Sequence, residues 1–425
     1  MNPQEPEPLR IRQIRIDGLF GLYNHCINLN LKERVTILHG PNGVGKTVTL
    51  RMVDAFAEGF SAIFAEIPFD QFSIGFTDGS SVRLVMLDKK SKLLQISLTS
   101  KTGDKNDAQI LTGNNLQSSE EKLYGVTSRK TLGRRRSSRL DRDDYNIQES
   151  KWPIDFTHII HTHFIETQRL LHVFPRSFGL FLNNAPELCL SIMECARDIN
   201  SRIQESLASY GQKSQTLEHS LPQRLLALTI GDLQDAELRE RMAKVEAQRQ
   251  ELQEIGILGE IATPLLDASK LDELIAQEKK MMTLYVIDSE QKLSVLADLA
   301  RRIRLLINSI NTKFKNKRLL IDLEKGFVVT NDANQILDLD SLSSGEQHEI
   351  VMLYDLLFRI KPNTLVLIDE PELSLHVVWQ KRFLPDLLKI AEVAQIDVLI
   401  ATHSPYIIGD YTDLMVALET GASHA

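Results

Sequence analysis

The feature that most constrains the fold is a short glycine-rich loop between an apolar run and an amphipathic segment. Residues 35–38 have the unbroken apolar character of a strand buried on both faces. The loop follows at residues 40–47, and the segment after it carries apolar residues at helical spacing. Two further apolar runs, residues 365–368 and 398–401, each follow a helix-like segment. We therefore expect an α/β core with a parallel sheet.

The loop itself matches the pattern GxxxxGK[ST], which binds nucleotide phosphates when it connects a strand to a helix. Its backbone N–H groups would wrap a β-phosphate, Lys46 would reach the β- and γ-phosphates, and the Thr47 hydroxyl would bind Mg²⁺. A chance glycine-rich turn is the alternative, but eight matching positions in the expected context disfavour it. The residues of this phosphate loop are Gly40, Pro41, Asn42, Gly43, Val44, Gly45, Lys46 and Thr47.

Two acids end the apolar run at residues 365–368. A buried strand would deliver Asp369 to the Mg²⁺ shell, and Glu370 would be placed to orient and deprotonate an attacking water. An apolar run followed by two acids is common by itself. Together with the phosphate loop, it predicts a site for hydrolysis of a nucleotide.

Residues 342–347 (LSSGEQ), which we call the signature segment, resemble the LSGGQ signature of ATP-binding-cassette (ABC) ATPases. Ser344 stands where glycine is usual, and the distance to Asp369 is the one that the family uses. The resemblance implies that these residues bind the γ-phosphate of ATP held by another subunit, so that ATP joins a dimer. The alternative is an ordinary helix cap. The phosphate-binding candidates here are Ser343, Ser344, Gly345 and Glu346.

Three more segments extend the resemblance. His403 follows a buried strand and is similar to the family's switch histidine, which contacts the γ-phosphate. Gln168 is the candidate for the Q-loop glutamine, which touches Mg²⁺ and the attacking water. Residues 374–376 fall where the D-loop crosses to the partner, and their DEPE…LH context resembles the SMC-like and overcoming-lysogenization (OLD) branches.

The spacing of these motifs indicates which branch the chain resembles. Long segments separate Lys46 from Gln168 and Gln168 from Ser343, unlike the compact cassette of a transporter. The arrangement is similar to the SMC, RecF and OLD-like ATPases, whose head is split around a helical excursion. We expect a mixed sheet plus an antiparallel β lobe, because residues 72–98 have the pattern of β-hairpins. The expected divisions are head lobe I at 1–180 with a basic mobile loop near 101–150, a helical, partly coiled-coil insertion at 181–315, and head lobe II at 316–425.

Within that branch the chain resembles the ATPase subunits of bacterial anti-phage systems, PtuA of Septu and retron-linked systems, with AriA of the PARIS system as the rival. Because few residues follow His403, we expect no Toprim domain like that of OLD nucleases. The resemblance thus implies ATP hydrolysis with Mg²⁺, a homodimer or assembly of dimers, and a separate effector such as an HNH nuclease. A repair or recombination ATPase of the SMC/RecF type and, less favoured, a transporter-energising cassette stay open.

Charge and composition limit the partners. The 49 basic and 57 acidic residues give a net charge of −8, so any contact with duplex DNA must come from a local patch. Residues 129–142 supply one candidate, although a solvated loop explains this run equally well. The three cysteines lack metal-site or disulfide spacing, and the sequence has neither a signal-peptide pattern nor a long apolar run. We expect a cytoplasmic protein without a membrane partner.

Overall fold

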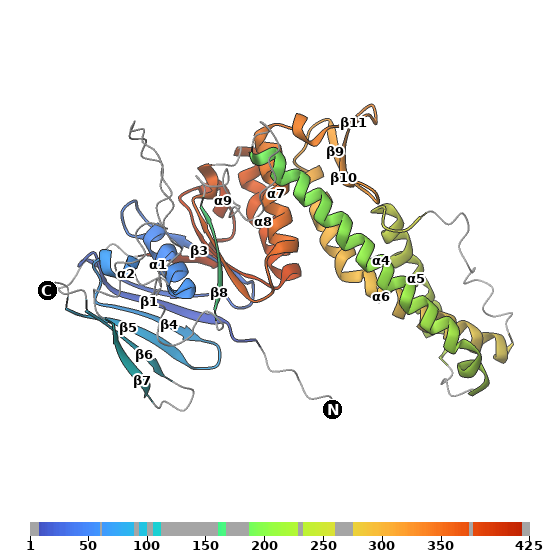
Figure 1. Cartoon of the computed structure of the whole chain (residues 1–425), viewed down its shortest axis with the longest axis horizontal. Helices are drawn as coiled ribbons and strands as arrows, with labels where there is room; N and C mark the ends of the chain where they lie inside the picture. The colour runs from blue at the N-terminus through green and yellow to red at the C-terminus, as the bar shows by residue number, and fades with distance from the viewer. Residues whose placement is uncertain are drawn as a thin grey trace, which may run out of the picture. The chain divides into compact units, whose positions relative to one another are not determined.

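The computed structural model divides the chain into two compact units. The first contains Met1–Arg169 and Ile360–Ala425, and the second contains Leu170–Arg359. Figure 1 labels many of the elements of both. The structure describes residues 8–59, 62–88, 93–99, 105–111, 160–166, 187–227, 233–259, 275–373 and 377–418.

The first unit contains the expected parallel sheet. All strand pairs of this sheet are parallel. Its middle strands are buried along their length, which explains their unbroken apolar sequence. The register places Asp369 beside Ala401, and Ala401 beside Leu38, so the carboxyl ends of three strands meet at one edge. In spatial order the strands are β14 (Met415–Ala417), β3 (Val35–His39), β13 (Asp397–Ala401), β12 (Thr364–Asp369) and β8 (His161–Glu166).

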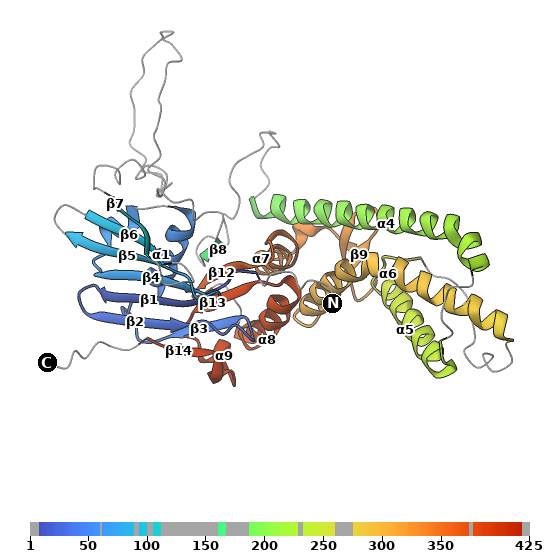
Figure 2. The same cartoon turned by 90° about the horizontal axis from the view of Figure 1, so that it is seen from below.

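A second, antiparallel sheet forms the expected β lobe of this unit (Figure 2). Helix α1 (Lys46–Glu58) shares one apolar core with both sheets, and α2 (Ala62–Glu66) adds Phe64, whose ring lies 5.3 Å from that of Phe72. The strands in spatial order are β2 (Tyr23–Asn28), β1 (Ile11–Leu19), β4 (Gln71–Phe76), β5 (Ser81–Asp88), β6 (Leu93–Thr99) and β7 (Lys105–Leu111).

One prediction is corrected at the edge of this sheet. Residues 101–150 are expected as a loop, but β7 lies inside that range and pairs with β6 in antiparallel register. Hydrogen bonding to a neighbouring strand outweighs the polar composition of this segment. The basic run at 129–142 lies outside the described residues.

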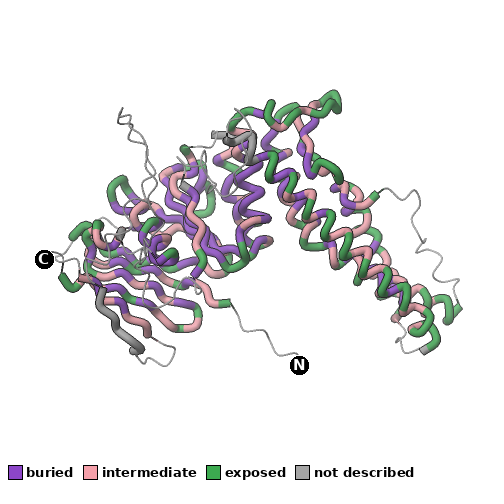
Figure 3. The backbone as a smooth tube through the Cα atoms, in the orientation of Figure 1, coloured by how far each residue is buried: buried purple, intermediate pink, exposed green. Residues whose placement is uncertain are grey.

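The remaining elements of the first unit follow β12. They are η8 (Pro371–Leu373), α8 (Val377–Ala394), α9 (Pro405–Ile408) and η9 (Thr412–Leu414). Figure 3 shows that burial in this unit is concentrated in the strands and in the helices that face them. Among the described residues of the whole chain, no helix has the length and apolar character needed to cross a membrane.

The second unit contains the expected helical segment. Arg224 pairs with Asp288 and Glu218 with Lys292, so α4 (Glu187–Ala227) and α6 (Ala276–Asn311) run antiparallel. The buried residues of α5 (Asp235–Glu254) are Leu238, Val245 and Leu252, and a spacing of seven is that of a coiled-coil seam.

A small sheet and the signature helix complete this unit. The turn between its first two strands leads into Gly326, whose φ is +87° and where a Cβ would come within 1.8 Å of the Ala196 carbonyl oxygen. The elements are β9 (Lys317–Asp322), β10 (Gly326–Asn331), β11 (Ile336–Leu337), η6 (Leu339–Ser341), α7 (Ser344–Tyr354) and a π-helical turn, η7 (Asp355–Arg359).

The division into units does not fall at residue 315, where we expect the insertion to end. The hairpin and α7 group with the helices because their contacts lie there. Lys313, just after α6, forms a buried ion pair with Glu349 on α7, and Tyr354 donates a hydrogen bond to Asp198 on α4 at 2.6 Å. These contacts join α7, which we call the signature helix, to α4 and to the end of α6.

Candidate functional site

The phosphate loop adopts the predicted strand–loop–helix geometry. It leaves β3 at His39 and enters α1 at Lys46. Gly43 and Gly45 have φ values of +82° and +97°, a region that favours glycine. A Cβ on Gly45 would also lie 2.6 Å from the Leu19 Cδ2 atom. Conformation and close packing therefore both require glycine at position 45.

Lys46 is a buried cation inside this loop. Its ammonium group donates hydrogen bonds to the carbonyl oxygens of Gly40 at 2.8 Å and Pro41 at 3.0 Å. Burial lowers the pKa of Lys46, while the carboxylates of Glu370, Asp369 and Glu372 act to raise it. The loop thus concentrates positive charge where a phosphate would bind, with acids nearby.

Thr47 and Asp369, both predicted as Mg²⁺ ligands, are in contact. The Thr47 hydroxyl donates a 3.0 Å hydrogen bond to Asp369 Oδ1, which joins the start of α1 to the end of β12. One hydroxyl and one carboxylate fit Mg²⁺, which takes few protein oxygens when it binds together with phosphates. Gln168, the third predicted ligand, lies outside the described residues.

Glu370 and His403, predicted to act in catalysis, face each other at the same sheet edge. The closest atoms, Glu370 Oε1 and His403 Nε2, are 3.8 Å apart, and each side chain is about one-third exposed. The backbone N–H of Glu370 bonds to the Ala401 carbonyl oxygen at 2.8 Å, and its φ is +43°. A left-handed glutamate is strained, and such strain concentrates at functional sites.

Glu372 is a site residue that the sequence analysis does not predict. Its carboxylate accepts hydrogen bonds from the Thr402 hydroxyl and the His403 backbone N–H, both at 2.8 Å, and from the Ser404 N–H at 3.1 Å. The available signal was its position, the third acid of the DEPE segment and two residues after Glu370.

His25 is a second such residue. Its Nε2 lies 2.8 Å from the carbonyl oxygen of Val44 in the phosphate loop, and the side chain is buried. Burial lowers the pKa of His25, so the ring is neutral at pH 7, and Nε2 carries the proton that it donates to the carbonyl. His25 therefore ties the loop to β2, a contact with no signal in the sequence.

The signature segment lies in the second unit, at the start of α7. Ser343 is the N-cap, and its N–H donates to Glu346 Oε2 at 2.8 Å while its Oγ accepts from the Glu346 N–H at 3.3 Å. This reciprocal pair is a capping box, so the helix-cap interpretation is confirmed. Ser343 and Ser344 are exposed, and phosphate binding by these residues stays a prediction.

The loop before α7 is held by side chains of the same unit. Gln347 Nε2 donates to the carbonyl oxygens of Leu339 and Leu342, both at 3.1 Å. Lys317 Nζ forms an ion pair with Glu346 Oε2 at 2.9 Å. Burial acts to raise the pKa of Glu346, but its hydrogen bonds with Lys317 and Ser343 lower it overall.

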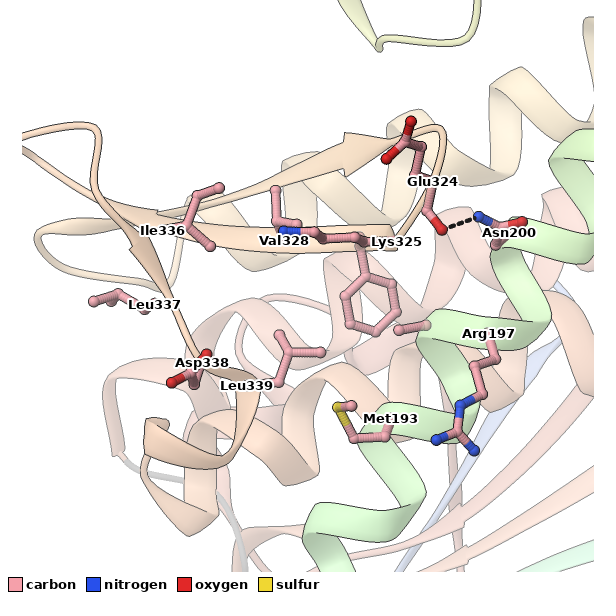
Figure 4. A pocket seen from close by; sticks show the side chains of 12 residues that line it. Met193, Arg197, Asn200, Glu324, Lys325, Val328, Ile336, Leu337, Asp338 and Leu339 are labelled. Atoms are coloured by element: carbon pink, nitrogen blue, oxygen red, sulfur yellow. Dashed lines mark hydrogen bonds between the residues drawn. The ribbon is translucent and has the colours of Figure 1, made fainter.

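A pocket of about 550 Å³ opens in the second unit between α4, β10 and η6 (Figure 4). Phe327, Leu339 and Met193 supply apolar surface, and Asn200 at its rim donates a 2.6 Å hydrogen bond to the Glu324 carbonyl oxygen. The lining contains no phosphate-loop residue. All of its lining residues belong to the second unit.

One family model matches the chain, described as "AAA domain, putative AbiEii toxin, Type IV TA system", over residues 237–409. The matched region includes the signature segment, Asp369, Glu370 and His403, but not the phosphate loop. No curated protein matches the sequence.

Several solved SMC head domains are similar to this chain at low sequence identity. The head from Pyrococcus furiosus, with an extended coiled coil and bound to the C-terminal domain of ScpA, has 13% identity and a TM-score of 0.35, over 97% of this chain and 94% of that chain. An SMC head bound to the C-winged helix domain of ScpA has 11% identity and a TM-score of 0.34, over 97% and 95%. The SMC head from Thermotoga maritima has 11% identity and a TM-score of 0.34, over 96% and 94%.

The geometry and the family match agree on the kind of domain. A glycine loop between a buried strand and a helix, with a lysine, a threonine and an aspartate brought together, is the arrangement of a nucleotide-phosphate site. The chain contains a P-loop arrangement within a mixed α/β fold that carries a long helical insertion, and its residues 237–409 are similar to the AAA-domain model.

Proposed function

We propose that this protein hydrolyses ATP and uses the reaction as a switch between dimer states. The observation that carries the proposal is the hydrogen bond from Thr47 to Asp369, because it joins the phosphate loop to the acidic strand end within one folded unit. At the same edge Glu370 faces His403. This is the set of groups that phosphoryl transfer to water requires.

Each of these residues has a distinct role in the proposed reaction. The loop amides and Lys46 bind the phosphates, and Thr47, Asp369 and Gln168 would hold Mg²⁺, whose charge offsets that developing on the transferred group. Glu370 accepts the proton of the attacking water, and His403 contacts the γ-phosphate. The protein contributes position and charge rather than covalent chemistry.

The second half of the proposal concerns a partner copy. Ser343, Ser344, Gly345 and Glu346 begin a helix, and the N–H groups at a helix start suit a phosphate. The two serines are exposed, which supports binding to ATP held by another subunit. Hydrolysis would then release the dimer.

For the biological role we propose a regulatory ATPase of an anti-phage system that controls a separate nuclease in the cytoplasm. The matching family model is described as a putative toxin of a toxin–antitoxin system, and this supports a role in defence. Duplex DNA is a candidate trigger through residues 129–142, whose seven basic residues give a local positive charge.

The test compares wild type with Glu370→Gln, using Glu392→Gln as the control. Glu392 is an exposed acid on α8 in the same unit. We expect Glu370→Gln to retain ATP, to lose turnover by about 100-fold or more, and to accumulate as a dimer. ATP turnover and mass by light scattering, each with and without duplex DNA, measure these effects. Full turnover and an unchanged mass in Glu370→Gln would contradict the proposal.

A further inference from the structure

We propose that Glu372 is a positioning residue for ATP hydrolysis, which acts by clamping the backbone that carries His403. This inference rests on the proposed function, because it assigns Glu372 a role in the same reaction. Glu372 does not join the groups expected to touch ATP. It acts through residues 402–404, which we call the switch loop.

The clamp uses both oxygens of one carboxylate. Oε1 accepts hydrogen bonds from two consecutive backbone N–H groups, those of His403 at 2.8 Å and Ser404 at 3.1 Å. Oε2 accepts from the Thr402 hydroxyl at 2.8 Å. Charge-assisted hydrogen bonds are about twice as strong as neutral ones, so three of them hold this loop firmly.

Gln380, on α8, closes the network from the other side. Its Nε2 donates to the backbone carbonyl oxygen of Glu372 at 3.1 Å, and its Oε1 accepts from the Ser404 hydroxyl at 2.9 Å. Thr402, Ser404 and Gln380 are all buried. A buried, connected polar network specifies a single arrangement of its members.

The clamp matters because of where the His403 ring projects. The ring is about one-third exposed and its Nε2 lies 3.8 Å from Glu370 Oε1. The buried anchor below the ring therefore sets its distance from the proposed general base. Loss of the clamp would let the ring shift while the phosphate loop stayed intact, and a 1 Å misplacement can cost about 100-fold in rate.

The first experiment is a double-mutant cycle. We expect Glu372→Ala to lower kcat about 10- to 100-fold while KM for ATP changes less than about threefold, since Lys46 and Thr47 still bind the phosphates. In a His403→Ala background, Glu372→Ala should add less than about a twofold loss, because the two residues act as one unit. Glu392→Ala is the control. Losses that multiply would overturn the proposal.

Glu372→Gln keeps the measurement meaningful if the alanine variant fails to fold. Its amide oxygen can still accept from both N–H groups, and its amide nitrogen can donate to the Thr402 oxygen. If both variants fold, we expect Glu372→Gln to have a higher kcat than Glu372→Ala. If only Glu372→Gln folds, its kcat should be about 2- to 10-fold lower than that of wild type, with KM unchanged. A glutamine variant equal to wild type in every parameter would count against a charged clamp.

Hydrogen exchange tests the clamp without hydrolysis. In Glu372→Ala the amides of His403 and Ser404 should exchange at least about tenfold faster, while Glu392→Ala leaves them unchanged. Unchanged protection would overturn the clamp even if the protein is an ATPase. If the amides exchange faster but the wild-type protein does not hydrolyse ATP, the hydrogen bonds of Glu372 are supported. The proposed function and the positioning role of Glu372 are then both wrong.

Discussion

In the first unit, contacts across long stretches of sequence join the residues around the phosphate loop, whereas in the second unit the cap of the signature segment comes from a near neighbour. Thr47 meets Asp369, and Glu372 meets residues 402–404. Ser343, by contrast, is capped by Glu346, three residues on. The first site exists only once its unit has folded. The cap of the second forms within the start of one helix, and Lys317 on β9 adds a contact to Glu346.

The difference suits the roles that we propose for the two regions. A catalytic edge gains from groups held in place before the reaction, because no energy is then spent on their reorganisation. A helix start with exposed serines leaves its outward face open to a ligand on another molecule. Four predictions, taken from the largest expected effect to the smallest, test this contrast.

The largest effect is expected at Lys46. We expect Lys46→Ala to reduce ATP turnover by about 100-fold or more, because it removes the cation that the loop would place beside the phosphates of bound ATP. Calorimetric titration with ATP should show a matching loss of affinity. Lys32→Ala, at an almost fully exposed position of the same unit, serves as the control. ATP affinity equal to wild type would show that the loop does not bind phosphate.

The next effect concerns what holds the signature helix. Lys313→Ala removes one side of a buried ion pair with Glu349, which should lower the free energy of unfolding by about 3–5 kcal/mol. Lys317→Ala removes a partly exposed pair with Glu346 and should cost about 1 kcal/mol or less. Urea titration followed by circular dichroism measures both. Equal losses would mean that the buried pair is not the anchor.

Ser343→Ala tests the capped helix start more directly. Loss of the cap should lower the free energy of unfolding by about 1 kcal/mol. ATP binding to the phosphate loop should not change, but the ATP-dependent dimer should weaken. Light scattering with ATP in the Glu370→Gln background reports the dimer, and Ser294→Ala on α6 is the control. A dimer as stable as before would restrict Ser343 to capping.

The smallest effect is a pH dependence in the π-helical turn after α7. Burial raises the pKa of Asp355 to about 6, with Arg359 opposing the rise and Asp198 adding to it. A pKa raised above that of the unfolded chain stabilises the fold at low pH, and this contribution is lost as pH rises through about 6. Asp355→Asn lacks this titration. The Tm of Asp355→Asn minus the Tm of wild type should therefore increase as the pH rises from about 5 to about 7.5. A difference that stays constant over this range would contradict the raised pKa of Asp355.

Much of the first unit could be predicted because its signals are local. An apolar run bounded by a glycine loop or by two acids indicates a buried strand wherever it occurs, and β3, β12 and β13 lie where those runs stand. Since parallel strands align their carboxyl ends, the meeting of Thr47 with Asp369 followed from the motifs. The strand β7 could not be predicted, because its polar sequence gains strand structure from pairing with β6.

The sequence by itself determined the phosphate loop, the acidic strand end, the helical segment and the capped start of α7, because glycine patterns, apolar periodicity and caps act over a few residues. Only the tertiary structure decided that Glu372 holds the backbone of His403 and that His25 holds Val44. The same is true of the grouping of α7 with the helical unit through Lys313. These are hydrogen bonds and ion pairs between distant positions, and a carboxylate or an imidazole in a sequence carries no mark of its partner until the chain brings the two together.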